Sequence, residues 1–203
     1  MYIHIKRIID FILAFIALVL LSPLFLILAL WIKMDSKGPV FFKQKRIGIN
    51  RSFFQIYKFR TMLSETPSDM PTHLLDNPDA FITKSGRFLR KTSLDELPQL
   101  INILKGEMAV IGPRPALWNQ EDLADERDKH DANDVLPGLT GWAQINGRDE
   151  LPIKDKAQLD GEYIRNMSFS FDVKCFFGTI LSIIKSDGVL EGGTGTLDKR
   201  SDN

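Results

Sequence analysis

The most marked pattern along the chain is an apolar run near its amino end. Residues 11–32 are uncharged, and all of them except Ser22 and Pro23 are apolar. This length meets the requirement of about 20 residues for a helix that crosses a membrane. Proline lacks an N–H and clashes with the preceding turn, and the neighbouring serine can bend a helix. The run therefore predicts two half-helices that meet at Ser22-Pro23, each too short to cross a hydrocarbon core of about 30 Å.

The apolar run has three interpretations. A cleaved signal peptide requires a shorter apolar region and a cleavage site of small residues, whereas this run continues into Trp31 and Ile32. A kinked helix that spans the membrane is compatible with proline, which is common in such helices. A re-entrant hairpin would return both ends to one face, and both ends carry basic residues, which favour the cytoplasmic side. The pattern leaves the spanning and re-entrant forms open.

The rest of the chain predicts a mixed α/β (α+β) domain in which helices predominate, with a small sheet and amphipathic helices at a membrane interface. Two short strands are expected in VFFKQKRIG and SFFQIYKFRTM, on either side of Asn50-Arg51. Residues 64–79 contain three prolines and indicate a mobile loop, either a lid or a surface insertion.

Helical spacing of apolar residues begins at residue 80, and a second helix is expected over about 94–104. MAVIGPRPA reads as a short buried strand, and residues 118–134 are acidic and indicate a solvated helix or loop. Residues 170–185 form an unusually apolar helix, which would either pack on the core or lie on a membrane surface.

The net charge is zero, but the charge is unevenly distributed. The first 118 residues carry 16 basic and 9 acidic side chains, and the remainder carry 10 and 17. A zero net charge argues against a strongly basic nucleic-acid-binding protein. A single cysteine, Cys175, excludes an internal disulfide framework and is expected to pack on its apolar helix. The three histidines are too scattered for a zinc motif.

The segment RFLRKTSLDELPQL is the richest in candidate chemistry. Ser93-x-x-Glu96 matches a capping box, which would place Asp95 and Glu96 in a first helical turn where the helix dipole favours an ionised carboxylate. Pro98 fits that register poorly, and a cap at Asp95 would instead bring Pro98 into the first turn. Both registers stay open. Acidic residues in a first turn are most often only caps.

Basic residues on stiff or tightly turned backbone accompany this acidic pair. Arginine in such positions suits bidentate phosphate binding, and a carboxylate beside it can accept a phosphoryl group or bind magnesium. The combination predicts phosphoryl-transfer chemistry. Asp160 and Asp172 could join a metal site, but caps or surface groups are the better interpretation. The basic residues expected to contact phosphate are Lys58, Arg60, Arg90, Arg114 and Arg148.

Five ordered motifs resemble the monotopic bacterial phosphoglycosyl transferases, also called bacterial sugar transferases. They are KRIIDFILA with the Ser22-Pro23 break, GPVFFKQKRIG, YKFRTM, TSLDELPQLINILKGEMAVIGPRP and PGLTGWAQINGR. The resemblance implies that Asp95, with Glu96 as its neighbour, attacks the β-phosphate of a UDP-sugar and releases UMP. Polyprenol (undecaprenyl) phosphate then takes the sugar phosphate from the enzyme. Mg²⁺ is the implied cofactor, with Asp95 as its ligand.

The resemblance also implies an arrangement of the chain. Residues 1–37 would be a re-entrant membrane anchor, 38–190 a cytoplasmic catalytic domain and 191–203 a flexible tail. The protein would be monotopic, on the cytoplasmic face of the bacterial inner membrane, and resembles a minimal catalytic form. Expected partners are a UDP-sugar, undecaprenyl phosphate and membrane lipid, with no nucleic acid, and a homodimer stays open.

The sugar is not readable from the sequence, and the product would enter a capsule, O-antigen or glycoprotein pathway. Two other functions compete with the transferase. One is a noncatalytic membrane-anchored scaffold that binds anionic lipid or nucleotide, and the other is an anchored phosphohydrolase.

Overall fold

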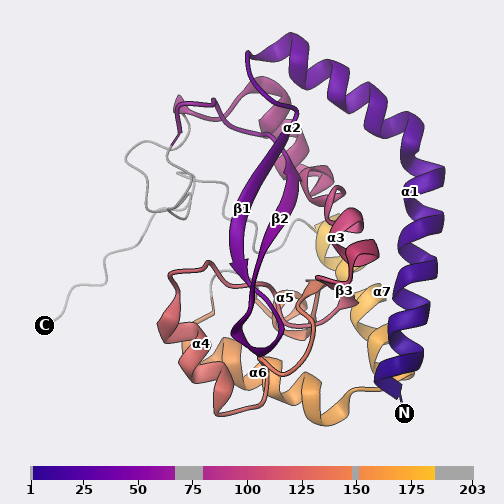
Figure 1. Cartoon of the computed structure of the whole chain (residues 1–203), viewed down its shortest axis with the longest axis vertical. Coiled ribbons are helices and arrows are strands. Elements are labelled where there is room, and N and C mark those ends of the chain that lie inside the picture. The colour runs from indigo at the N-terminus through magenta and orange to yellow at the C-terminus, as the bar shows by residue number, and fades with distance from the viewer. Residues whose placement is uncertain (1, 67–79, 148–150, 186–203) are drawn as a thin grey trace, which may run out of the picture.

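The computed structural model describes residues 2–66, 80–147 and 151–185 (Figure 1). Helices dominate and strands are short, which confirms the expected mixed class, but two separate two-stranded sheets replace the single small sheet. The elements are α1 (Tyr2–Asp35), β1 (Phe41–Ile47), η1 (Ile49–Arg51), β2 (Phe53–Phe59), α2 (Lys84–Lys91), η4 (Leu94–Glu96), α3 (Gln99–Lys105), β3 (Ala109–Ile111), α4 (Glu121–Asp128), β4 (Gly138–Thr140), α5 (Trp142–Ile145), α6 (Ile153–Asn166) and α7 (Phe169–Lys185).

Helix α1 contains the whole apolar run and, among the residues that the structure describes, is the one helix long and apolar enough to cross a membrane. The expected interruption at Ser22-Pro23 is wrong, because the helix continues through Pro23 and only bends along its length (Figure 1). Pro23 has no N–H for the carbonyl of Val19, and the Ser22 hydroxyl donates to that carbonyl at 2.8 Å. The serine satisfies the acceptor that proline leaves unpaired, so the helix stays intact.

One side of α1 packs on the domain and the rest of its circumference is exposed. Ala14 packs with Ile56 and Ile103, and Ile32 packs with Phe59. Apolar side chains of this kind are each worth about 1.5–3 kcal/mol when removed from water, so the exposed part of α1 suits lipid. Those at least 50% exposed include Ile12, Phe15, Val19, Leu20, Leu26, Ile27 and Leu30.

Both ends of α1 are bound to the same domain. Near its start, the Lys6 ammonium donates to the carboxylate of Asp172 on α7 at 2.8 Å. At its last residue, Asp35 accepts hydrogen bonds from the backbone N–H and the hydroxyl of Ser85 on α2, at 2.8 and 2.7 Å. Figure 1 shows the start of α1 beside α7 and its end near α2. These contacts hold the helix along one side of the molecule.

The two strands expected on either side of Asn50-Arg51 are present as β1 and β2, and they pair as an antiparallel hairpin. Phe41 pairs with Phe59 at one end and Ile47 with Phe53 at the other. The chain turns between them at residues 50–51, where both residues have left-handed backbone with φ of 52° and 54°. Ile56 is 2% exposed, so the face that it shares with Lys58 is directed toward the interior.

The segment with the expected capping box folds differently. Ser93 has φ +56°, and its side chain caps no helix, while its carbonyl accepts the N–H of Glu96 at 3.3 Å. One 3₁₀ turn, η4, follows, and α3 begins only at Gln99. Neither predicted register is correct, because the left-handed Ser93 turns the chain sharply after α2. Pro98 precedes α3, where its missing N–H breaks no helical hydrogen bond.

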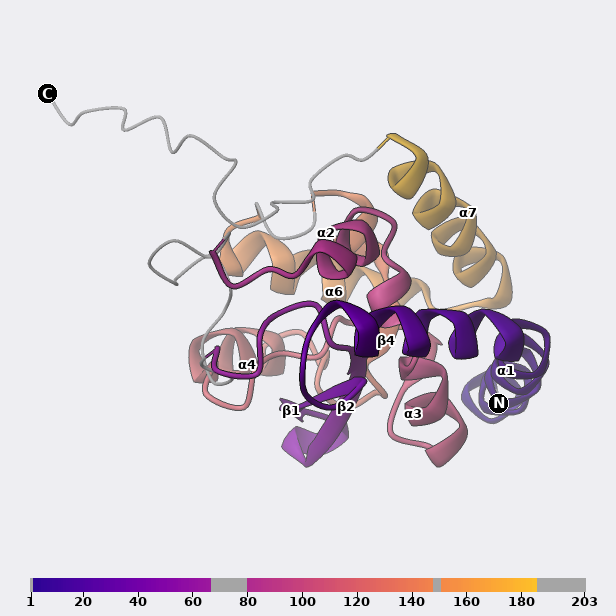
Figure 2. The ribbon, with the colours of Figure 1, turned by 90° about the horizontal axis from the view of Figure 1, so that it is seen from above.

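The carboxyl-terminal part places its helices against the second sheet. Strands β3 and β4 pair in parallel. The hydrophobic pattern of the sequence had not predicted helix α6. Helix α7 is confirmed and combines both interpretations, since Cys175 is fully buried whereas Phe177 and Leu181 are each 59% exposed. Seen from above, α7 and the hairpin lie on opposite sides of α1 (Figure 2). The predictions for most of the loop 64–79, for Arg148 and for the tail 191–203 fall outside the described residues.

Candidate active site

The site is built where β2 passes the turn η4. Lys58, near the end of β2, directs its ammonium to Glu96 Oε1 at 2.7 Å and lies 3.9 Å from Asp95 Oδ2. The side chains of Lys58, Asp95 and Glu96 are 17%, 13% and 17% exposed, so water reaches the cluster only in part. The tight 3₁₀ turn brings both neighbouring carboxylates to the same cation.

Arg114 approaches the same pair from the segment after β3. It is flanked by Pro113 and Pro115, which stiffen its backbone. Its two terminal nitrogens donate to Glu96, at 2.7 Å to Oε1 and 3.3 Å to Oε2. This bidentate contact orients both groups. Both oxygens of Glu96 are thus occupied, whereas Asp95 accepts no hydrogen bond from any residue in the described ranges.

The two carboxylates differ in acidity for this reason. Burial alone would raise the pKa of Glu96, but the charges of Arg114 and Lys58 and their hydrogen bonds outweigh it and hold that pKa well below its usual range. Burial raises the pKa of Asp95 to about 6, with a further rise from Glu96, because Lys58 lies too far away to compensate fully. Glu96 is a fixed anion, and Asp95 is the carboxylate with a free oxygen.

A small pocket adjoins the pair. Its basic lining residues come from β1, β2 and the segment after β3, and a buried amide comes from the start of α3. Two of the cations already neutralise Glu96, and the excess positive charge favours an anionic ligand. The lining residues are Arg46, Ile56, Lys58, Gln99, Arg114 and Pro115.

The structure brings together four of the predicted site residues, namely Lys58, Asp95, Glu96 and Arg114. A fifth, Arg90, donates from Nε to the Thr61 hydroxyl at 2.9 Å, and its charge contributes to lowering the pKa of Asp95 against the larger effect of burial.

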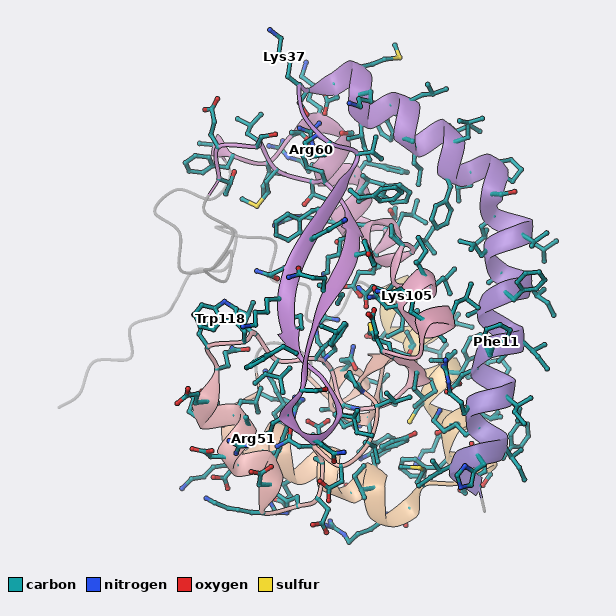
Figure 3. The ribbon with its side chains drawn as sticks, viewed as in Figure 1. Phe11, Lys37, Arg51, Arg60, Lys105 and Trp118 are labelled. Carbon is teal, nitrogen blue, oxygen red and sulfur yellow. The ribbon has the colours of Figure 1, made fainter. Side chains whose placement is uncertain are left out.

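Arg60 is used elsewhere. It is 4% exposed, and its guanidinium donates to the carbonyls of Ser36, at 2.8 Å, and Lys37, where the chain leaves α1. Figure 3 shows Arg60 close to Lys37 at that end of the molecule. The Arg60 guanidinium is therefore engaged by the backbone after α1. Arg148 falls outside the described residues.

Sequence reasoning missed two residues that line the pocket. Arg46 lies opposite Phe54 in the hairpin, on the face that also carries Ile56 and Lys58. Pairing the two predicted strands in antiparallel fashion across their short connection would have placed Arg46 on this face. Gln99 lies four residues after Asp95, and this proximity was the only feature of the sequence that could have indicated a place in the site.

The two remaining acidic candidates serve the fold. Asp160 accepts two hydrogen bonds from Arg127, at 2.8 and 2.6 Å, and is 1% exposed. Asp172 accepts hydrogen bonds from Tyr2, Lys6 and Tyr163. The expectation of caps or surface groups is wrong for both as a role, because Asp160 is buried and Asp172 partly buried against partners from distant parts of the sequence.

The carboxylates offer limited coordination for a metal ion. Within the described ranges, no three histidine, cysteine or acidic side chains form a metal-binding group. Magnesium, however, is commonly held by one or two carboxylates together with substrate phosphates and water. Asp95 fits that role because its oxygens accept no hydrogen bond from the described residues, whereas Glu96 is occupied by Lys58 and Arg114.

Comparison with known proteins identifies relatives of this chain. The chain is 39% identical over 194 residues to the "Uncharacterized sugar transferase EpsL" of Bacillus subtilis (strain 168), which covers 96% of this chain and 94% of that protein. It is 42% identical over 182 residues to the "UDP-glucose:undecaprenyl-phosphate glucose-1-phosphate transferase" of Escherichia coli (strain K12), which covers 86% of this chain but 39% of that protein.

A third relative is the "UDP-N-acetylgalactosamine-undecaprenyl-phosphate N-acetylgalactosaminephosphotransferase" of Aeromonas hydrophila, 39% identical over 195 residues, which cover 92% of this chain and 45% of that protein. The chain thus spans less than half the length of the last two relatives. The family described as "Bacterial sugar transferase" matches residues 1–186, a range that contains all the described residues. The chain therefore belongs to the bacterial sugar transferase family.

Proposed function

We propose that this protein transfers a sugar-1-phosphate from a UDP-sugar to undecaprenyl phosphate and releases UMP, as the first membrane step of surface glycan synthesis. Two relatives bear the names of such transferases, one for glucose and one for N-acetylgalactosamine. The observation that carries the proposal is the division of the acidic pair. Glu96 is held as an anion by Lys58 and Arg114, and Asp95 is left with an unbonded carboxylate beside a cationic pocket.

The reaction proceeds in two displacements at phosphorus. An oxygen of Asp95 attacks the β-phosphorus of the UDP-sugar, the bond from that phosphorus to the bridging oxygen breaks, and UMP leaves with the electron pair. A phosphate oxygen of undecaprenyl phosphate then attacks the same phosphorus, and the Asp95 carboxylate leaves. The products are undecaprenyl-diphosphate-sugar and the original enzyme.

The basic residues orient the phosphates and offset their charge. Arg114 and Lys58 keep Glu96 ionised, and their charges also face a phosphate in the pocket. Arg90 adds a third positive charge near Asp95. Magnesium, when bound, would offset diphosphate charge, and Asp95 is the residue that would hold it.

We place the protein on the cytoplasmic face of the bacterial inner membrane, with α1 entering and leaving the bilayer on that side. The exposed apolar side chains of α1 and α7 support membrane contact. The binding of both ends of α1 to one domain, through Lys6 and Asp35, supports a monotopic arrangement over a spanning one.

Covalent labelling tests the proposed intermediate. The purified protein in detergent is incubated with magnesium and a UDP-sugar labelled in the sugar, without undecaprenyl phosphate. UDP-glucose and UDP-N-acetylgalactosamine are the first sugars to test. We expect label on the chain, one equivalent of UMP released, and no label on Asp95→Asn. Asp155→Asn is the matched control, since Asp155 is exposed on α6 and its substitution leaves the label unchanged.

Other outcomes would replace the proposal. Transfer to undecaprenyl phosphate by an enzyme that never becomes labelled would mean direct transfer without the aspartyl intermediate. Release of free sugar phosphate would indicate the anchored phosphohydrolase, and absence of any turnover with all UDP-sugars would favour the scaffold.

A further inference from the structure

Gln99 has a buried amide without a partner. It is the first residue of α3, it is 1% exposed, and its Nε2 finds no hydrogen-bond acceptor among the described residues. A buried donor of this kind is unfavourable, because it has lost its bonds to water and gained none in the fold. The Nε2 donor therefore has no acceptor in the described fold and is left for a group that enters the adjoining pocket.

Asn102, one turn later on the same helix, shows the opposite case. It is fully buried, and its Nδ2 donates to the Gln55 carbonyl and to Glu107, both at 2.7 Å. Its Oδ1 accepts the N–H of Tyr57 at 3.0 Å. The Asn102 amide is thus fully hydrogen-bonded and connects α3 to the hairpin, whereas the Nε2 of Gln99 makes no hydrogen bond to the hairpin.

The surroundings of Gln99 define what it could bind. The residue lines the pocket together with Arg46, Lys58 and Arg114. Three cations and one N–H donor suit a compact anion whose several oxygens accept hydrogen bonds, which describes a phosphate. A carboxylic acid offers only two oxygens, and a neutral sugar hydroxyl would leave the cations without a counter-charge.

We propose that Gln99 is a substrate-binding residue whose Nε2 donates to a non-bridging oxygen of a substrate phosphate, and that this oxygen enters the pocket, which has room for about one water-sized group. The inference rests on the proposed function, in which two phosphate groups enter the site besides the β-phosphate that Asp95 attacks: the α-phosphate that leaves as UMP, and the phosphate of undecaprenyl phosphate. A neutral donor suits either group, because it orients the phosphate without adding another charge that would slow release of the product.

The first measurement concerns stability. Gln99→Met keeps the length of the side chain and removes the donor, so thermal unfolding of the ligand-free protein in detergent should occur at the wild-type temperature or higher. Asn102→Leu on the same helix should unfold several degrees lower, because it removes three hydrogen bonds. Destabilisation by Gln99→Met would mean that the amide serves the fold, and would overturn the proposal.

The second measurement concerns binding, with UMP and inorganic phosphate as probes in calorimetry. Gln99→Met should bind both about tenfold more weakly, as expected for one lost hydrogen bond to a charged group. Gln99→Glu should bind them more weakly still, because its carboxylate would occupy Lys58 and Arg114. Gln55→Met, on the exposed side of β2, is the matched control and should bind like wild type. Wild-type binding by Gln99→Met would overturn the proposal.

The two half-reactions identify the source of the phosphate. If the pocket holds the nucleotide phosphate, Gln99→Met raises the UDP-sugar concentration needed for half-maximal labelling about tenfold and leaves transfer from the labelled enzyme unchanged. If it holds the lipid phosphate, only the second half-reaction requires more undecaprenyl phosphate. Weaker phosphate binding by Gln99→Met in a protein that never becomes labelled would retain the phosphate site and reject the aspartyl intermediate.

Discussion

Asp95 and Glu96 are neighbours in the chain, but the negative charge of Glu96 is compensated by nearby cations and that of Asp95 is not fully compensated. Glu96 contributes to stability because it pairs with Lys58 and Arg114, which would otherwise be partly buried cations without a counter-charge. Asp95 is buried to a similar extent, and among the described residues only Lys58 lies within 4 Å of its carboxylate, at 3.9 Å. Its negative charge is therefore unfavourable in the free protein, as is usual for a group kept for chemistry.

This difference predicts opposite effects on stability as the pH changes. The pKa of Asp95 is raised from 3.8 to about 6, so its contribution to stability is complete below pH 3.8 and is lost as the pH rises through about 6. Asp95→Asn should then stabilise the metal-free protein at pH 8, by up to roughly 3 kcal/mol at 1.36 kcal/mol per pKa unit, with no difference below pH 4.

Glu96→Gln should do the reverse. The pKa of Glu96 is lowered, so its contribution to stability is present above the ordinary pKa of a glutamate and is lost toward acid pH. Urea unfolding in detergent with EDTA, at pH 4 and pH 8, measures both variants. Equal destabilisation by Asp95→Asn and Glu96→Gln at pH 8 would contradict this account of the pair.

At the scale of elements, α1 is attached at both ends and unattached along its lipid-facing side. Arg7, near its start, donates to the carbonyl of Ile103 at the end of α3, at 2.7 Å. The guanidinium of Arg60 binds the carbonyls just after its end, where the helix dipole is negative. The middle of the helix bends and carries strongly exposed apolar side chains, such as Leu20 at 72%.

Cysteine accessibility tests the arrangement of this helix. Because both ends are bound to one domain, we expect Ile3→Cys and Lys37→Cys to react with a membrane-impermeant maleimide only when the cytoplasmic side is exposed. Leu20→Cys should be protected by lipid. Cys175 gives no background, since it is fully buried and burial, with the charge of Asp172, raises its pKa to about 11. Reaction of Ile3→Cys from the periplasmic side would show that α1 spans the membrane.

At the scale of the whole molecule, the acidic second half is tied to the basic first half. The hairpin turn presents Arg51 to Asp125 and Asp128 of α4, each at 2.5 Å. Behind this exposed cluster, Arg127 of the same helix forms a buried ion pair with Asp160 of α6 at 2.6 Å. The acidic segment that the sequence pattern indicated as solvated therefore has one solvated face and one face fixed to the domain.

The buried pair predicts a non-additive result. Asp160→Asn should destabilise the protein by roughly 3–5 kcal/mol, because it leaves the Arg127 charge buried without its partner. The double variant Arg127→Met, Asp160→Leu should recover most of that loss, since well-packed apolar side chains can replace a buried pair. Urea unfolding of the two variants measures the effect. A double variant as unstable as Asp160→Asn would show that the loss does not come from a buried charge left without its partner.

Local pattern was sufficient for α1, α7, the two strands of the hairpin and the core of the site. Apolar spacing predicted both helices, and β1 and β2 were predicted as strands on either side of Asn50-Arg51, without their antiparallel pairing. Asp95 and Glu96 were found because two carboxylates stood among arginines. Lys58 and Arg114 were found as cations on stiff backbone, and the structure brings both to Glu96.

The errors arose where distant contacts override local preference. Ser93 satisfied the motif of a capping box, but Glu96 is bound by Lys58 and Arg114 instead of returning to the backbone. Arg60 was predicted to bind phosphate and Asp160 to be a cap or surface group. Their partners, the Ser36 carbonyl and Arg127, lie far away in the sequence and cannot be identified from local pattern. Gln99 was missed because an unsatisfied amide becomes visible only when its surroundings are known.

The contact between Lys6 and Asp172 also sets an order of assembly during synthesis. The two residues are 166 positions apart, so α1 leaves the ribosome long before its partner exists. Lys6 also lies 3.3 Å from Asp10, one turn along the same helix, so its charge has a local partner as soon as that turn forms. The partner on α7 arrives only with the last helix, so closure of this contact requires nearly the whole chain.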